Sequence, residues 1–359
     1  MKTRSTVFVG MSGGVDSSVS AYLLKQQGYE VVGVFIKVWH PDFLPCHWER
    51  ERLDAMRVAA HLEIPFLTCD AEAVYKKDVA DYFIAEYAAG RTPNPDVMCN
   101  THVKFGAFYD FARAHGADYI ATGHYAQTLT HNERVTLVRG VDPQKDQSYF
   151  LWNVREEVLQ HVLFPIGGLT KAAVRRIAHK VQLPTAQKRE SQGICFLGHV
   201  DIPSFLAHFV TLEEGVVLTD EGVTVGVHDG ALLYTIGQRH GFRINPEHTH
   251  VDPYYVVQKD MARNILTVSH TKPKVGAVGS LLTLQSAWIH KEPTNSACMV
   301  QTRYRQHPTL GEVQSFHDGV LTVALLEAGE LPAVGQSCVL YNDNRVMGGG
   351  IIAEIPASV

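Results

Sequence analysis

The stretch that decides the fold runs from Val7 to Ser18 and reads VFVGMSGGVDSS. Its apolar start, Val7 to Val9, predicts a buried strand, and the residues from Val15 onward predict a helix. A turn of glycine and serine joins the two. Glycines let backbone N–H groups approach an anion closely, serine hydroxyls add donors, and the N-terminal end of a helix is partially positive. The pattern therefore predicts a phosphate-binding loop.

This loop lacks the lysine of a kinase-type Walker motif, which would reach the terminal phosphates of a nucleotide. It resembles instead the pyrophosphate loop of AMP-forming ATP enzymes. An ordinary glycine turn at a helix start is the alternative interpretation. We expect ATP as cofactor, with Mg²⁺ near the carboxylate of the loop, and nucleotide contacts from Gly10, Met11, Ser12, Gly13, Gly14, Val15, Asp16 and Ser17.

The chain has 359 residues, of which 45% are hydrophobic, enough for two or three domains that each bury a core. Its apolar runs fall short of the ~18 residues that cross a bilayer, and its N-terminus lacks the pattern of a signal peptide. We therefore expect a soluble cytoplasmic protein with no membrane contact. The net charge of −5 gives no global attraction for nucleic acid, so RNA binding would use local patches.

Strand and helix patterns alternate in the first part of the chain. Apolar runs at Thr6–Gly10, 31–36, Phe66–Cys69 and Tyr119–Ala121 read as strands, and the patterns at 52–61 and 72–89 read as helices. This alternation predicts a doubly wound parallel sheet of the α/β class. Because ligands bind beyond the carboxyl ends of such strands, the phosphate loop, Ile36 and Gly123 are expected at one edge.

From about Gly215 the chain alternates β-branched and aromatic residues with glycine turns, and helical periodicity disappears. We expect a catalytic domain over residues 1–210, a small central β-rich domain over 211–275 and a C-terminal β-barrel over 276–359.

Six cysteines stand at positions 46, 69, 99, 195, 298 and 338 without a close pair, which argues against a zinc ribbon or a secreted disulfide framework. Cys69, Cys298 and Cys338 lie in apolar runs and are expected to be structural. His40, Cys46 and His47 fit no zinc spacing, so no metal site is predicted there.

Two cysteines have unusual surroundings. Cys99 ends the proline-stiffened segment 91–100 and leads into a helix, whose dipole would favour the thiolate, while Asp96 would oppose it or accept a proton. Cys195 has glycines on both sides, which would permit close approach of a substrate. Taken alone, either cysteine is more often a small buried hydrophobe.

Six separated motifs carry a resemblance that covers effectively the whole chain: the phosphate loop and residues 91–100, 121–125, 145–150, 193–196 and 348–352. In this order they resemble the tRNA-specific 2-thiouridylase family. The resemblance implies an ATP-pyrophosphatase domain, a small central domain and a C-terminal β-barrel. It also implies an enzyme that adenylates the 2-oxygen of the wobble uridine of tRNA and replaces it with sulfur.

The resemblance also implies the catalytic roles. Cys195 would carry the sulfur as a persulfide, and Cys99 would be the second thiol, so that a Cys99–Cys195 disulfide accumulates after one turnover. The residues themselves do not decide which cysteine is which. Asp96 would be the general acid or base, or would merely cap the proline turn.

Further roles follow from the same resemblance. Ile36 and Gly123 would border the nucleotide. A sulfur donor protein, either a cysteine desulfurase or a relay carrier, would be a partner. Contacts to tRNA would come from Asn94, Pro95, Asp96, His124, Lys145, Asp146, Gln147, Arg303, Tyr304 and Gln336. Arginine and tyrosine at 303–305 suit phosphate clamping and base stacking, although a solvated strand face explains them equally well. A basic stretch, 171–189, would add charges for RNA phosphates.

Two other functions fit part of this pattern. An AMP-forming amide ligase shares the phosphate loop but needs no paired thiols. A tRNA-binding protein without catalysis would release no pyrophosphate.

Overall fold

The computed structural model describes residues 4–44, 48–132, 134–189, 201–248, 252–273, 280–289, 297–327 and 331–355. The chain divides into two compact units. The first comprises Met1–Ala80, Pro95–His199 and Asn342–Val346, and the second comprises Asp81–Asn94, Val200–Tyr341 and Met347–Val359. The division into three domains stays a prediction.

The first unit is built on a five-stranded parallel sheet of order β3-β2-β1-β4-β7. The strands are β1 (Thr6–Gly10), β2 (Glu30–Lys37), β3 (Phe66–Asp70), β4 (Tyr119–Ala121) and β7 (Val162–Leu163). From β1 the chain proceeds outward through β2 and β3, then returns to place β4 on the other side of β1. The predicted doubly wound sheet is confirmed, and its strand order reverses between β1 and β4.

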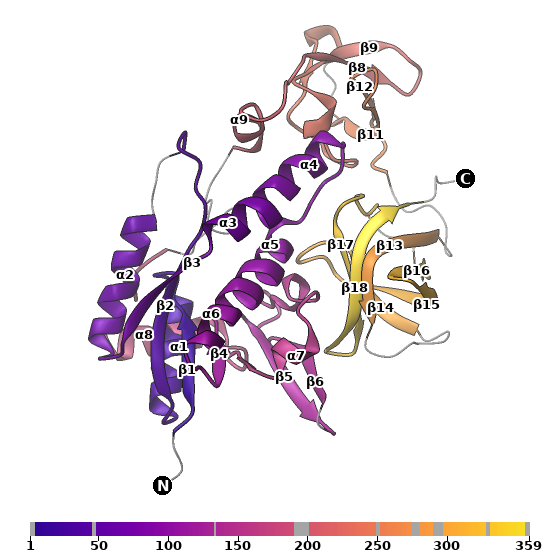
Figure 1. Cartoon of the computed structure of the whole chain (residues 1–359). Helices are drawn as coiled ribbons and strands as arrows, with labels where there is room; N and C mark the ends of the chain where they lie inside the picture. Colours follow the sequence, from indigo (N-terminus) through magenta and orange to yellow (C-terminus); the bar gives the residue numbers. More distant parts are fainter. Residues whose placement is uncertain are drawn as a thin grey trace. The chain divides into compact units, whose positions relative to one another are not determined.

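Helices cover both faces of this sheet (Figure 1). Val7 and Val9 of β1 face a core that includes apolar residues of α1 (Val15–Gln26), α2 (Trp48–His61) and α8 (Lys171–Lys180). Side chains alternate along a strand, so Gly10 faces the other way, toward Phe108 of the opposite helical layer. That layer is formed by α5 (Pro95–Met98), η2 (Cys99–Ala107) and α6 (Phe108–Ala114).

Shorter elements complete the first unit. They are α3 (Glu72–Tyr75), the π-helix η1 (Lys76–Asp81, whose last residue belongs to the second unit), the hairpin β5 (Ala126–His131) and β6 (Arg134–Arg139), η3 (Ser148–Phe150) and α7 (Glu156–Leu159).

The second unit contains α4 (Tyr82–Ala88), α9 (Ile202–Leu206) and a five-stranded sheet of order β10-β9-β8-β12-β11. Its strands are β8 (Gly215–Thr219), β9 (Thr224–His228), β10 (Arg243–Ile244), β11 (Tyr255–Asp260) and β12 (Ile265–Ser269), with short helices η4 (Ala231–Leu233) and η5 (Pro246–His248). The β-rich region therefore begins at Gly215, as predicted.

The second unit also contains a barrel. Its strands are β13 (Ser280–Ile289), β14 (Ala297–Gln301), β15 (Thr309–His317), β16 (Val320–Leu325), β17 (Ser337–Asn342) and β18 (Arg345–Glu354). They follow the order β13-β16-β15-β14-β17-β18, and β18 pairs back with β13, which closes the sheet. Leu282, Val300, Val323 and Leu340 fill its core. The predicted C-terminal β-barrel is confirmed.

Candidate active site

The phosphate loop joins β1 to α1 and keeps the N-terminus of α1 open. Gly14 is the residue before the helix and offers no side-chain cap, so backbone N–H groups of the first turn remain available to an anion. The backbone N–H of Ser12 donates to the Ser17 hydroxyl at 3.3 Å, and the Ser18 hydroxyl donates to the Gly14 carbonyl at 2.7 Å. Ser12 is exposed, whereas Ser18 is fully buried. The loop thus has the shape of an anion cradle.

Two glycines are required by this geometry. Gly13 has φ +71°, and a Cβ there would lie 2.5 Å from the carbonyl oxygen of Glu51. Gly123 follows β4, and a Cβ there would lie 2.7 Å from the backbone nitrogen of Ser17. The loop after β4 therefore lies against the first turn of α1, where the strand order reverses, the place at which such sheets bind ligands.

The remaining predicted nucleotide residues lie around this point. Met11, Val15 and Ile36 are buried at 1%, 5% and 6% exposure, so their apolar side chains pack in the interior and their predicted contacts with the nucleotide would come from the backbone. A Cβ at Gly10 would lie 3.5 Å from Ile36 Cδ1, which shows that β1 and β2 meet closely here.

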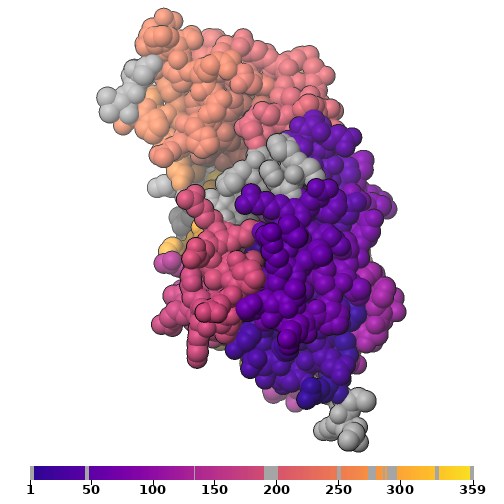
Figure 2. Space-filling model, turned by 90° about the vertical axis from the view of Figure 1, so that its left-hand side faces the viewer, coloured from indigo at the N-terminus to yellow at the C-terminus, as the bar shows by residue number. Residues whose placement is uncertain are grey.

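Asp16 is held by two side chains from elsewhere in the first unit. Lys171 Nζ donates to Asp16 Oδ1 and Oδ2 at 2.7 and 2.8 Å, and the Tyr125 hydroxyl donates to Oδ1 at 2.8 Å. The lysine nitrogen lies 5.7 Å from the centre of the Tyr125 ring. In Figure 2 the rose-coloured segment that contains α8 lies against the indigo N-terminal segment on the visible face. A cation therefore stands at the phosphate loop.

The segment 142–148 is tied to the same place. Gln147 binds Tyr125 twice, because its side-chain oxygen accepts from the Tyr125 N–H at 3.0 Å and its own N–H donates to the Tyr125 carbonyl at 2.9 Å. Asp146 is 8% exposed and accepts from Arg139, Gly140 N and Ser148. Asp146 thus fixes the conformation of the segment 142–148 through its hydrogen bonds, and Lys145 beside it is half-buried. Contacts of these residues with tRNA stay a prediction.

Cys99 lies one turn inside a helix rather than at its start. The helix begins at Pro95, so Asp96 occupies the first turn and Cys99 opens the π-helical segment η2. Cys99 is 0% exposed. Because the helix dipole acts mainly within the first turn, it favours the thiolate less than expected, whereas π-helical segments are frequent at functional sites. Cys195, the other predicted catalytic residue, lies outside the described residues.

His124 is buried at 7% exposure between Thr122 and Lys104. Its Nε2 lies 3.4 Å from Lys104 Nζ and its Nδ1 lies 2.8 Å from Thr122 Oγ1. An ammonium group has no lone pair, so Nε2 accepts and Nδ1–H donates to Thr122. Burial, and then the charge of Lys104, lower the pKa of His124 well below its ordinary value. A cationic contact with RNA is therefore not expected from His124 in this conformation.

We predict that His124 stays neutral as the pH falls through about 6.5, where an unperturbed histidine titrates. The unfolded chain binds this proton below about pH 6.5 and the folded chain does not, so stability falls as pH falls through that value. Thermal unfolding of the His124→Gln variant should depend less on acid pH than that of the unchanged protein. The imidazole resonance that is absent from the NMR spectrum of this variant is the resonance of His124. A ring that titrates near pH 6.5 would contradict this account.

Gln336 holds the segment that leads into the Asp96 helix. Within the second unit, its Nε2 donates to the carbonyls of Thr92 and Pro93, both at 2.9 Å. The Thr92 N–H donates to the Val334 carbonyl at 2.9 Å, and Asn94 is 7% exposed. Gln336 thus binds protein in this conformation, and its predicted contact with tRNA is untested.

Gln336→Ala should loosen this segment. Loss of two hydrogen bonds, each contributing about 0.5–1.5 kcal/mol, should speed amide exchange at Arg91–Thr92 by about tenfold or more. Gln314→Ala is the matched control, because Gln314 is exposed on β15 and its amide donates to Glu312 of the same strand at 3.2 Å. If Gln336→Ala weakens tRNA binding but leaves amide exchange at Arg91–Thr92 unchanged, Gln336 contacts RNA rather than this segment.

Arg303 and Tyr304 follow β14 on the barrel. Arg303 is exposed and Tyr304 is half-buried, with Arg305 over the Tyr304 ring at 5.2 Å from its centre. This placement permits phosphate and base contacts, which stay a prediction.

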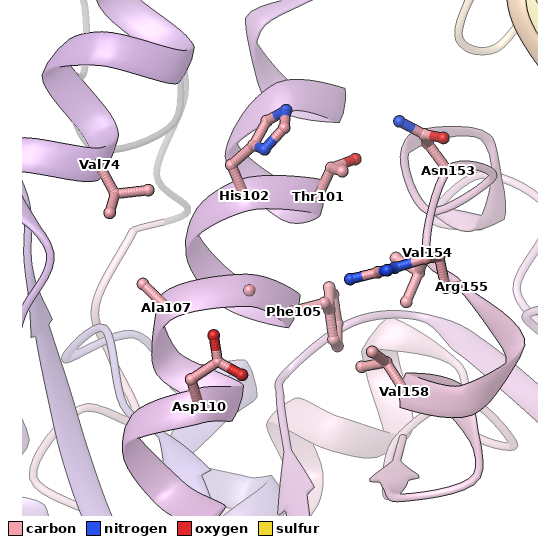
Figure 3. Close-up of a pocket in the computed structure, with 11 residues that line it drawn as sticks. Val74, Thr101, His102, Phe105, Ala107, Asp110, Asn153, Val154, Arg155 and Val158 are labelled. Carbon is pink, nitrogen blue, oxygen red and sulfur yellow. The ribbon is translucent and has the colours of Figure 1, made fainter.

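A cavity of about 560 Å³ lies elsewhere in the first unit (Figure 3). Phe105 and Val158 line it together with His102, Asp110 and Arg155, and the Arg155 side chain extends toward Phe105. Among the residues that the structure describes, no predicted catalytic or nucleotide residue lines this cavity.

The three cysteines expected to be structural are buried. Burial raises the pKa of Cys69 and of Cys298 to about 11, and raises that of Cys338 as well, so none is a ready thiolate near neutral pH. Across the described ranges, His, Cys, Asp and Glu form no group of three that could hold a metal ion. In the same part of the chain, no helix combines the length and apolarity that crossing a bilayer requires.

Two residues at the site are not evident from the sequence. Lys171 belongs to a basic stretch predicted to serve RNA, and Tyr125 belongs to a motif in which it has no predicted role of its own. Two lysines of the basic stretch form ion pairs within the protein: Lys171 pairs with Asp16, and Lys188 pairs with Asp54 at 2.8 Å. The sequence signal for Lys171 is limited to its place at the start of an amphipathic helix.

Comparison with known proteins supplies independent information. The chain matches three family models in succession: the tRNA methyl transferase HUP domain over residues 5–199, the tRNA methyl transferase PRC-barrel domain over 203–270 and the aminomethyltransferase beta-barrel domain over 278–352.

Curated relatives match over nearly the full length. The tRNA-specific 2-thiouridylase MnmA of Yersinia enterocolitica is 44% identical over 99% of this chain and 98% of the relative. The proteins of the same name from Colwellia psychrerythraea and Lysinibacillus sphaericus are 43% and 42% identical, over 97% of this chain and 96% and 94% of each relative. A solved 4-thiouridine synthetase–RNA complex with bound ATP is only distantly similar, with 18% identity, a TM-score of 0.34, and coverage of 57% of this chain and 50% of that chain.

Proposed function

The chain belongs to the tRNA-specific 2-thiouridylase family, and from this premise we propose that it uses ATP to replace the 2-oxygen of the wobble uridine of tRNA by sulfur. The observation that carries the proposal is identity above 40% to enzymes of that name over at least 97% of the chain. The open N-terminus of α1, where the strand order reverses between β1 and β4, supports the use of ATP.

The chemistry explains why both a phosphate loop and thiols are needed. The 2-oxygen of uracil is a poor leaving group, so it first attacks the α-phosphorus of ATP, and the bond from that phosphorus to pyrophosphate breaks. Pyrophosphate leaves within the loop Ser12–Ser17. Sulfur then adds to C2, and AMP departs with the former 2-oxygen. Mg²⁺ enters with ATP, and the Asp16 carboxylate suits it as a hard oxygen ligand.

Sulfur transfer is proposed to use both cysteines. The terminal sulfur of a Cys195 persulfide attacks C2, and the Cys99 thiolate then attacks the Cys195 sulfur, which releases the thiocarbonyl and forms a Cys99–Cys195 disulfide. In the alternative order, Cys99 attacks first and frees hydrosulfide, which attacks C2. Both orders oxidise two thiols per turnover, so a reductant must restore them. Asp96, half-exposed in the first helical turn, is the proposed general acid or base.

The partners follow from this chemistry. Transfer RNA is the substrate, and a cytoplasmic sulfur donor protein, a cysteine desulfurase or a relay carrier, is proposed to load Cys195. An AMP-forming amide ligase remains the competing function, and it would not depend on either thiol.

The function is tested by incubating the protein with ATP, Mg²⁺, a sulfur source and unmodified tRNA. We expect retarded migration of the tRNA in a mercury-containing gel, since mercury binds thiocarbonyl sulfur. Unchanged migration with a folded, persulfidated protein would contradict the proposal.

A further inference from the structure

The phosphate loop gains its cation from a distant helix. Lys171 is the first residue of α8, yet its ammonium group lies within 2.8 Å of both carboxylate oxygens of Asp16 in the first turn of α1. Its side chain is 13% exposed, against 32% for Asp16. A kinase-type loop carries such a lysine in its own sequence, whereas here residues 155 positions apart supply the pair.

A lysine is unfavourable at this position for α8 itself. The N-terminal end of a helix behaves as about half a positive charge, which repels a cation. The first turn of α8 contains no acidic residue, and the cap comes from Thr170, whose hydroxyl accepts from Ala173 N. The Asp142 carboxylate offsets the partial positive charge of the helix N-terminus, because it accepts a hydrogen bond from the Lys171 N–H at 2.9 Å. The ammonium group therefore serves the phosphate loop rather than its own helix.

The loop requires such a charge. A lone Asp16 carboxylate beside an anion cradle would repel phosphate oxygens, and Lys171 neutralises it. Pyrophosphate also develops negative charge as its bond to the α-phosphorus breaks, and a fixed cation at that place lowers the barrier. The Tyr125 hydroxyl, 2.8 Å from Asp16 Oδ1, holds the carboxylate in place while the lysine changes partners.

We propose that Lys171 is the cation that binds the pyrophosphate part of ATP and stabilises it as the leaving group, with Tyr125 as a positioning residue for the Asp16–Lys171 pair. This inference rests on the ATP-dependent chemistry proposed above. In the structure the Lys171 ammonium group is paired with Asp16. Asp16 would hold the Mg²⁺ that accompanies ATP, and the Lys171 ammonium group would then bind the β- and γ-phosphate oxygens.

The test measures binding of two separate parts of the nucleotide, so it is independent of tRNA thiolation. Inorganic pyrophosphate and AMP are titrated into the full chain with Mg²⁺ by calorimetry. Lys171→Met should weaken pyrophosphate binding by about 10- to 100-fold, the range for loss of a charged hydrogen bond, and leave AMP binding within about twofold. Lys77→Met is the control, because Lys77 is exposed on η1.

The alternative is that the ion pair only fastens α8 to α1. Thermal unfolding of each variant measures how much the ion pair contributes to stability. Lys171→Gln keeps a hydrogen-bond donor for Asp16 but removes the charge. If Lys171→Met is unstable, pyrophosphate binding by Lys171→Gln distinguishes the two roles. Unchanged pyrophosphate binding in a folded variant would overturn the proposal. Equal loss of pyrophosphate and AMP binding in the glutamine variant would also overturn it, since it would assign Lys171 a structural role.

Discussion

Replacing Cys99 by serine is expected to reduce formation of 2-thiouridine by at least about 1,000-fold while tRNA-dependent release of pyrophosphate continues in a first turnover. The reason is that adenylation uses the phosphate loop, whereas sulfur release needs a thiolate, and a serine hydroxyl is far less acidic and forms no disulfide. Cys195→Ser should have the same phenotype, because it removes the proposed carrier of the persulfide. Mass spectrometry of digested tRNA and a pyrophosphate assay measure the two steps separately.

Cys298→Ser is the matched control for these variants. Cys298 is 3% exposed in the barrel core, and burial raises its pKa, so its loss should affect stability but not sulfur transfer. If the Cys99 or Cys195 variant still thiolates tRNA at near the normal rate, the two-thiol mechanism is wrong, and a ligase-like use of ATP becomes the better explanation.

Gly123→Ala should nearly abolish the use of ATP. The added methyl group would lie 2.7 Å from Ser17 N and 2.9 Å from the carbonyl carbon of Asp16, and backbone cannot rotate away as a side chain can. The loop after β4 and the first turn of α1 must then separate, and a displacement of about 1 Å in a catalytic site costs about 100-fold. We expect kcat/KM for ATP to fall by about that factor or more, with tRNA binding retained.

Gly168→Ala provides the comparison, since its Cβ would meet only Gln127 Oε1, at 3.9 Å. This variant should retain normal ATP kinetics and stability. Normal kinetics in Gly123→Ala as well would show that the loop after β4 and the first turn of α1 do not enclose the nucleotide.

The sequence is sufficient to predict the sheet because its signals are local. Val7–Val9 form an apolar run that ends in glycine, and β1 has the predicted bounds Thr6–Gly10. The same holds for β4 at Tyr119–Ala121 and, within a residue, for β2 and β3. Helix starts are harder to place: α2 begins at Trp48, four residues before the predicted Arg52, and the helix of Cys99 already begins at Pro95. Proline fits a first helical turn as well as a loop, which explains the second difference.

The site can be predicted only where its residues are close in sequence. Ser12 to Ser17 form one continuous loop, so their pattern is readable. Lys171 reaches Asp16 only because α8 packs on α1, and no local pattern records that contact. Gln336 is predicted to contact RNA, yet in the structure its amide binds the carbonyls of Thr92 and Pro93. The partners of such polar side chains are distant in sequence, so they can be identified only from the folded structure.

The central claim is that the 2-oxygen of the uridine is activated by transfer of AMP before sulfur enters. It is tested most directly with tRNA whose wobble uridine carries ¹⁸O at the 2-position, incubated with the protein, ATP and a sulfur source. Mass spectrometry should find one ¹⁸O in the phosphate of each AMP produced, in equal amount to the 2-thiouridine formed. AMP without the label, with ¹⁸O released to water, would contradict the account.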